Sequence, residues 1–185
     1  MKIGLGTIIF GLAMIVAAGA ASAGMSDADC GSLDIHVVGA AADGAVECRR
    51  GDTGGGDNGK ATEELIQVRA ARSLLVILHA RAGVRTYINS TKVKDMIQSF
   101  TVFDSTADWG GMQSSHKFTV QPFRGVFGGS STTMPCFGFS RHIGRVSGTT
   151  GYRHGLWGFY CDFLGEEVET GRIDELLGDV ALDYD

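Results

Sequence analysis

The fold of this chain is decided by two segments near its C-terminal end, PCFGFSR at residues 135–141 and GLWGFYCDF at residues 155–163. In both segments aromatic and small residues alternate with a period of two, which is typical of β-strands. If Cys136 faces Cys161 in an antiparallel pair, the same register places aromatic rings opposite glycines, which protects weak strand positions. The expected pairs are Gly138 with Phe159 and Phe139 with Gly158. We therefore predict a β-hairpin.

The residues between these segments, Ile143 to His154, are predicted to form a long mobile tip. The candidate binding residues lie in it or beside it: Arg141, His142, Arg145, Arg153 and His154. Guanidinium and imidazolium groups bind anions through charge-assisted hydrogen bonds. The tip is thus the predicted contact with a partner protein, an envelope polymer or a small anion. A solvated polar loop without a ligand is the alternative.

An enzymatic site is the competing functional hypothesis. His142 and His154 could meet at the base of the hairpin and, with a carboxylate such as Asp162, bind a metal or form the site of a small periplasmic hydrolase. No catalytic motif has diagnostic spacing, since Ser140 is followed by His142 where a nucleophile elbow requires glycine. The sequence therefore favours a non-enzymatic binding or accessory protein without a metal or other cofactor.

The N-terminal residues Met1–Ala23 have the pattern of a secretory signal peptide. Lys2 precedes an almost wholly apolar run, and Ala21-Ser22-Ala23 fits the A-x-A cleavage pattern. A membrane anchor is the alternative, but the apolar run is short for a span of about 20 residues. We expect cleavage after Ala23 and a periplasmic or secreted protein without a stable membrane anchor.

Four cysteines in an exported chain indicate two disulfides, because oxidising compartments form and preserve them. Of the three possible pairings we favour Cys30–Cys48 and Cys136–Cys161, since each joins segments expected to pair as hairpins. The first of these hairpins would place the strand at residues 35–38 beside the strand at residues 45–48. A zinc site is the alternative, but the paired C-x₂₋₄-C spacing of such sites is missing.

Length and charge limit the remaining possibilities. Residues 24–185 have the usual size of one globular domain. Removal of Lys2 with the leader changes the formal charge from −5 to −6. A net negative charge disfavours nucleic-acid binding, which depends on neutralising phosphates with lysine and arginine.

The other segments complete an α+β prediction, a mainly antiparallel sheet with one or two packed helices and disulfide-linked hairpins. The glycine-rich residues 51–60 are expected to form a flexible loop. Residues 64–82 fit either a helix or a strand, because periodicity cannot separate the two for the short apolar run at 74–78. The apolar spacing from Glu166 to Leu182 predicts a terminal amphipathic helix.

Overall fold

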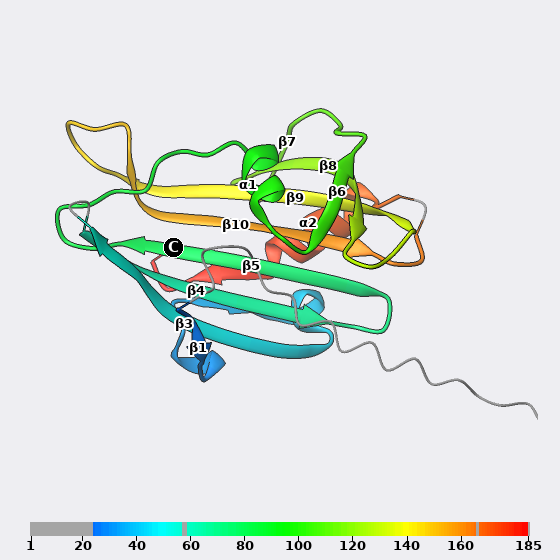
Figure 1. Ribbon diagram of the computed structural model, residues 1–185, viewed down its shortest axis with the longest axis horizontal. Coiled ribbons are helices and arrows are strands. Elements are labelled where there is room, and N and C mark those ends of the chain that lie inside the picture. The colour runs from blue at the N-terminus through cyan, green and yellow to red at the C-terminus, as the bar shows by residue number, and fades with distance from the viewer. Residues whose placement is uncertain (1–23, 57–58, 166, 185) are drawn as a thin grey trace, which may run out of the picture.

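The computed structural model describes residues 24–56, 59–165 and 167–184, and Figure 1 shows their arrangement. The expected leader, Met1–Ala23, lies outside the described residues. Among the described residues no helix is both long enough and apolar enough to cross a membrane. The chain forms a mostly antiparallel sheet with two α-helices and two disulfides, which confirms the α+β class.

One large sheet organises the molecule, with strand order β1-β3-β4-β5-β10-β9-β8-β6 and with β7 paired to β8. Every neighbouring pair of strands in it is antiparallel. Its strands are β1 (Ser26–Asp27), β3 (Ala45–Gly56), β4 (Gly59–Arg69), β5 (Ser73–Ala82), β6 (Phe103–Ala107), β7 (Gln113–Ser115), β8 (Phe118–Phe127), β9 (Thr133–Arg145) and β10 (Tyr152–Asp162).

Shorter elements cover both faces of this sheet, as Figure 1 shows. The helix α1 (Val93–Ser99) packs on one face, where the buried cluster includes Trp157 and Phe159. The other face carries α2 (Thr170–Gly178) and a second sheet of β2 (Ile35–Val37) and β11 (Val180–Leu182). Two 3-10 turns, η1 (Cys30–Ser32) and η2 (Gly39–Ala42), flank β2.

Residues 64–82, for which the sequence did not distinguish a helix from a strand, lie in β4 and β5 and the turn between them. The coverage of both faces of the sheet explains why the sequence was ambiguous there. In the run Leu74 to Leu78, alternate side chains enter the two opposite core clusters, and all of them are buried. A strand that is buried on both faces has no polar alternation. The pattern therefore resembles a helix segment although the structure is a strand.

The register of β9 and β10 agrees with the alternation in the sequence. Cys136 pairs with Cys161, Gly138 with Phe159 and Phe139 with Gly158. The Phe139 ring lies over Gly158, since a Cβ there would come within 2.4 Å of that ring. At Gly138 the close neighbours are Val93 and Ile97 of α1, so this glycine allows the helix to approach the sheet.

The two disulfides have the pairing that the sequence favoured, Cys30–Cys48 and Cys136–Cys161. The second lies in the core, where both cysteines are buried. The first ties η1 to β3, so it does not link the expected hairpin. β2 pairs with β11 and β3 with β4, because the C-terminal residues 180–182 form a strand where a helix was expected to continue.

Two further expectations about loops are wrong. The glycine-rich residues 51–60 belong mainly to strands, since β3 continues to Gly56 and β4 begins at Gly59, while residues 57–58 lie outside the described residues. The tip between β9 and β10 spans only residues 146–151, because ladder pairs continue to Arg145 and Tyr152. Cross-strand hydrogen bonding thus extends beyond the apolar positions that indicated the strands.

Candidate functional site

Three segments of the chain, two of them loops, meet at one end of the large sheet. The amide of Gly83 donates to the carbonyl of Lys60, and Ile88 exchanges two backbone hydrogen bonds with Tyr152, each at 2.9 Å. Arg153 reaches the carbonyls of Gly83 and Thr86 at 3.5 Å. These contacts hold the start of β4, the segment at residues 83–92 and the β9–β10 loop together.

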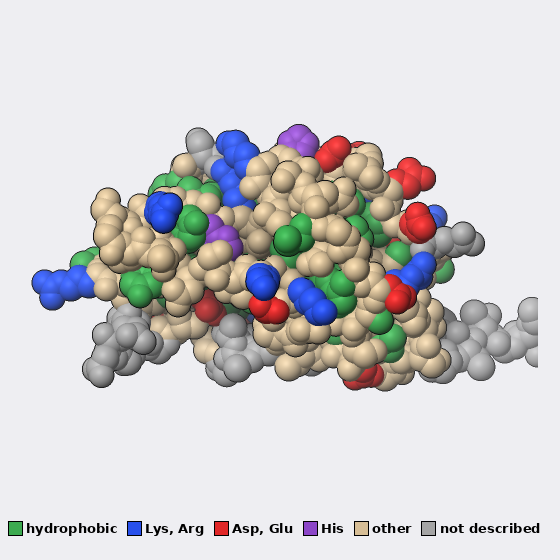
Figure 2. All heavy atoms as spheres, turned by 90° about the horizontal axis from the view of Figure 1, so that it is seen from above, with side chains coloured by type: hydrophobic (Ala, Val, Ile, Leu, Met, Phe, Trp, Pro, Cys, Tyr) green, Lys and Arg blue, Asp and Glu red, His purple; other side chains and the backbone are tan. Residues whose placement is uncertain are grey.

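Four exposed cations lie at this end, which we call the basic end: Lys60, Arg85, Arg145 and Arg153. Beside them Val84 is 88 % exposed and Tyr87 is 48 % exposed. Tyr87 and Arg145 line, with residues 146–150, an open cavity of about 760 Å³. Figure 2 shows lysine and arginine side chains at this end, whereas most acidic side chains on the visible face lie toward the other end.

The five residues predicted for the tip do not form one site. Arg145 and Arg153 are exposed at the basic end. Arg141 lies within the sheet, with its guanidinium group 5.7 Å from the centre of the Phe118 ring. His142 and His154 lie on opposite faces of the sheet, because His142 contacts the Trp157 ring and His154 contacts His79.

This geometry separates the residues of the expected hydrolase site. Along a strand the rise is about 3.3 Å per residue. Asp162, at the other end of β10, is therefore about 26 Å from His154, and its carboxylate accepts from the amides of Leu164 and Gly165. The described structure does not bring His142, His154 and Asp162 together.

His142 is packed as an apolar ring and not as part of an anion site. Its ring lies 5.5 Å from Trp157 and 5.1 Å from Tyr152, and its Nε2 is buried without a hydrogen-bond partner among the described residues. Burial lowers the pKa of His142 below its ordinary value. The neutral ring is therefore the form that this environment favours.

A substitution tests this description of His142. We expect His142→Phe to raise the free energy of unfolding by about 1 kcal/mol, because an unsatisfied buried polar atom is removed. Folding favours the neutral ring, so wild-type stability should fall as pH decreases below the unfolded pKa near 6.5, and the variant should show less of this fall. Urea denaturation measures both effects, and a less stable variant would contradict the assignment.

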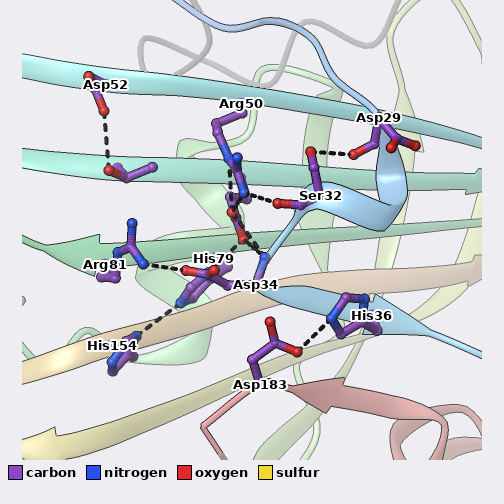
Figure 3. A network of polar contacts seen from close by, with 12 residues as sticks. Asp29, Ser32, Asp34, His36, Arg50, Asp52, His79, Arg81, His154 and Asp183 are labelled. Atoms are coloured by element: carbon purple, nitrogen blue, oxygen red, sulfur yellow. Dashed lines mark hydrogen bonds and ion pairs between the residues drawn. The ribbon is translucent and has the colours of Figure 1, made fainter.

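A buried polar network lies on the face of the sheet that carries β2 and β11 (Figure 3). Its centre is Glu64 of β4, which is 1 % exposed. Both carboxylate oxygens accept from the Asp34 amide, at 3.1 and 2.9 Å, and Oε1 accepts from Arg50 Nη2 at 2.6 Å and Nε at 3.1 Å. These donors and His79 overcome the cost of burial and lower the pKa of Glu64 to about 2.

Two histidines extend this network from Glu64 towards the surface. His79, which is fully buried, places Nδ1 at 3.0 Å from Glu64 Oε2 and Nε2 at 3.2 Å from Nδ1 of His154. An ionised carboxylate can only accept, so Nδ1 of His79 carries a proton. When both rings are neutral, Nδ1 of His154 must donate to Nε2 of His79, and Nε2 of His154 has the free lone pair.

The surroundings of His154 favour its uncharged form. Arg81 donates to the Asp34 carboxylate at 2.8 Å and to the Tyr184 hydroxyl at 3.0 Å, and the Tyr184 ring lies 4.8 Å from His154. Desolvation, followed by the nearby His79 and Arg81, lowers the pKa of His154 below its ordinary value. The network therefore presents a neutral imidazole in one tautomer at its half-exposed end.

The same residues have the donor types of a metal site, since ligand atoms of Asp34, Glu64 and His79 lie within 4.8 Å of one another. Arg50 and Arg81 already bind the two carboxylates, however, and their charges balance those of the acids. A cation would have to displace both guanidinium groups. The arrangement is therefore better described as an ion-pair network.

Of the residues in this network, only His154 was predicted from the sequence as a site residue. His79 does leave a signal, because it interrupts the run of buried apolar residues 74–80, and Glu64 begins the buried run 64–68. A charged or titratable residue at such a position must find a partner within the core. The partners are Asp34 before β2, Arg50 of β3 and residues near the C-terminus, and no local sequence pattern indicates these contacts.

A second open cavity, of about 770 Å³, lies at the opposite end of the sheet. Its lining mixes charges of both signs, and its cations have acidic neighbours: Arg72 lies 3.8 Å from Asp162, and Arg172 lies 2.6 Å from Glu175. This cavity has no excess of one charge that would select an anion or a cation.

The fold and these sites define an antiparallel α+β protein with two disulfides, a basic end and a buried carboxylate–histidine network. Comparison with known proteins gives no match to a family model, to a curated protein or to a solved structure.

Proposed function

We propose that this chain is an exported, non-enzymatic binding or accessory protein that attaches through its basic end to an anionic component of the cell envelope. Four exposed cations lie at the same end of the sheet as exposed Val84 and Tyr87, in a protein whose formal net charge is −5. This gathering of cations and apolar side chains at one end is the observation that carries the proposal. The two disulfides fit an oxidising, exported location.

Among anionic components, a phospholipid surface fits the basic end best. Arginine near an anionic bilayer contributes about 1 kcal/mol to binding, and exposed apolar side chains beside it can enter the boundary between headgroups and acyl chains. Val84 is almost fully exposed at the turn after β5, where a folded monomer gains nothing from it. We infer that cleavage after Ala23 leaves this surface as the attachment to the membrane.

Vesicle binding tests the proposal. Replacing Arg85, Arg145 and Arg153 with glutamine should weaken binding to vesicles of phosphatidylcholine and phosphatidylglycerol by about 100-fold, at about 1 kcal/mol for each cation. The matched control replaces Arg72, Lys94 and Lys117 with glutamine, which removes the same charge at exposed positions away from the basic end. Wild-type binding should also fall as salt increases.

Three results would contradict the proposal. These are equal binding to vesicles without phosphatidylglycerol, equal loss in the control variant, and no vesicle binding by the wild type. Retained binding to a soluble polyanion in the last case would move the proposal from a lipid surface to an envelope polymer.

A small hydrolase is the second candidate, because His154 is a neutral imidazole held by His79 and Glu64. Such an arrangement resembles a general base with an orienting partner. Neither of the two cavities described above is lined by His154, however. The basic end therefore remains the better supported site.

A further inference from the structure

A second carboxyl group of β4, that of Glu63, is partly buried. Glu63 is the neighbour of Glu64 on β4, so its side chain points to the opposite face, the one that carries α1. Its Oε2 is buried and has no hydrogen-bond partner among the described residues. Burial raises the pKa of Glu63 to about 7. A buried carboxylate without a donor is costly, so a cation that reached it would be bound.

The neighbouring side chains on this face do not supply that cation. Glu63 pairs with Gly51 on one side and with Ala80 on the other, and Ala80 pairs in turn with Gly155. Along β4 the next side chains on the same face are Ala61 and Leu65. None of these residues carries a charge or a side-chain donor.

Three titratable residues further away on this face do not reach Glu63 either. Arg153 is two residues along β10 from Gly155, and its guanidinium group donates to the carbonyls of Gly83 and Thr86. Arg49 is two residues along β3 from Gly51, and its Nε lies 3.6 Å from Asp27. His142 pairs with Gly155 and is therefore three strands from Glu63, about 14 Å at the usual strand spacing. None of the three contributes to the raised pKa of Glu63, which burial alone causes.

Backbone from the N-terminal side packs directly on Gly51, the cross-strand partner of Glu63. A Cβ on Gly51 would lie 2.8 Å from the carbonyl oxygen of Gly24 and 3.0 Å from Cα of Met25. Gly51 and Glu63 are cross-strand partners, whose side-chain positions are about 5 Å apart on the same face. Met25 also packs against the buried cluster on this face. Gly24 is therefore within reach of a glutamate side chain from Glu63.

We propose that the Glu63 carboxylate is a binding site for the α-ammonium group of Gly24, which forms when the leader is removed after Ala23. Hydrolysis of the Ala23–Gly24 peptide bond by water leaves a carboxylate on Ala23 and an amine on Gly24, which takes up a proton. In the uncut chain the same nitrogen is a neutral amide. Cleavage thus supplies the missing cation and ties the new N-terminus to β4.

This inference goes beyond the proposed function but rests on its cleavage site. The test therefore uses a chain that starts at Gly24, released by a site-specific protease and with both disulfides formed. Whether the cell itself cuts after Ala23 is measured separately, from the mass of the exported protein. Failure of natural cleavage and failure of the ion pair are thus distinguishable.

The measured quantity is the pKa of the α-amino group, taken from the pH dependence of its acylation rate. Its ordinary value is about 7.7–8.0. In the chain that starts at Gly24 we expect a value about 1 unit higher, and in the variant Glu63→Gln we expect the ordinary value. Glu47→Gln, which removes an exposed carboxylate of β3, is the matched control and should keep the raised value.

A second altered chain keeps the test decisive if Glu63→Gln does not fold. It keeps Glu63 and carries one additional residue before Gly24, which moves the ammonium group by up to about 3.6 Å. Its α-amino group should have the ordinary pKa. An ordinary value in the chain that starts at Gly24, or the same raised value in either altered chain, would overturn the proposal.

Discussion

The double variant Cys136→Ala/Cys161→Ala is expected to unfold with a free energy about 3.5 kcal/mol below that of the wild type. The disulfide spans 25 residues and restricts the unfolded chain, which in the loop-entropy model gives a stabilisation of about this size. Both sulfurs lie in the core, between the central strands β9 and β10, so the whole sheet depends on this closure. Alanine avoids the free thiols that single substitutions would leave.

Equilibrium denaturation of the oxidised proteins measures this difference. The comparison variant is Cys30→Ala/Cys48→Ala, whose bond spans 18 residues and holds η1 to β3 near the edge of the sheet. Its loss should be smaller, because η1 can separate locally while the rest of the sheet stays folded. Equal melting temperatures for the wild type and the Cys136/Cys161 variant would contradict the predicted role of that disulfide.

Glu64→Gln is expected to lower the free energy of unfolding at neutral pH by about 3 kcal/mol. Removing one member of a buried ion pair leaves the others uncompensated, at a cost of about 3–5 kcal/mol. Here the new amide would place donor hydrogens against the Asp34 amide, the Arg50 guanidinium group or His79. Asparagine and glutamine amides accept only through their single oxygen, so one set of donors loses its acceptor.

Glu64 should also make the free energy of unfolding depend on pH under acidic conditions. The pKa of Glu64 in the folded chain, about 2, lies below the ordinary value of 4.5. The folded state therefore binds fewer protons, so this stabilisation is complete above pH 4.5 and is lost as pH falls through 4.5 towards 2. The difference between wild type and Glu64→Gln should shrink over that range. Glu167→Gln, at an exposed position, is the control. It should change neither the free energy of unfolding at neutral pH nor the dependence of that free energy on pH.

The central hairpin illustrates how much of this fold could be predicted from the sequence. Alternation in residues 135–141 and 155–163 indicated the register of β9 and β10, because side chains with a period of two specify which face is buried. The structure of residues 74–78 could not be predicted in the same way, because a strand that is covered on both faces shows no alternation of apolar and polar residues. Covering elements such as α1 and β11 come from distant parts of the chain.

The candidate site was less predictable than the fold. Arg145 and Arg153 were expected at a tip and do lie at the basic end, but Lys60 and Arg85 join them only because three segments meet there. The network around Glu64 depends on residues from Asp34 to Tyr184. Such contacts follow from tertiary packing, so a local pattern could mark Glu64 and His79 as unusual without naming their partners.

The strand order has a consequence for how the chain folds. Strands β3–β5 and strands β8–β10 each pair with their neighbours in sequence, whereas the central seam joins β5 at residues 73–82 to β10 at residues 152–162. Closing such distant segments is slow, because the entropy of a long loop is lost before any contact compensates for it. During synthesis from the N-terminal end, the apolar edge of β5 therefore waits unpaired until β10 emerges. This interval is when an exposed strand edge aggregates most readily, and it is when a chaperone would be most useful.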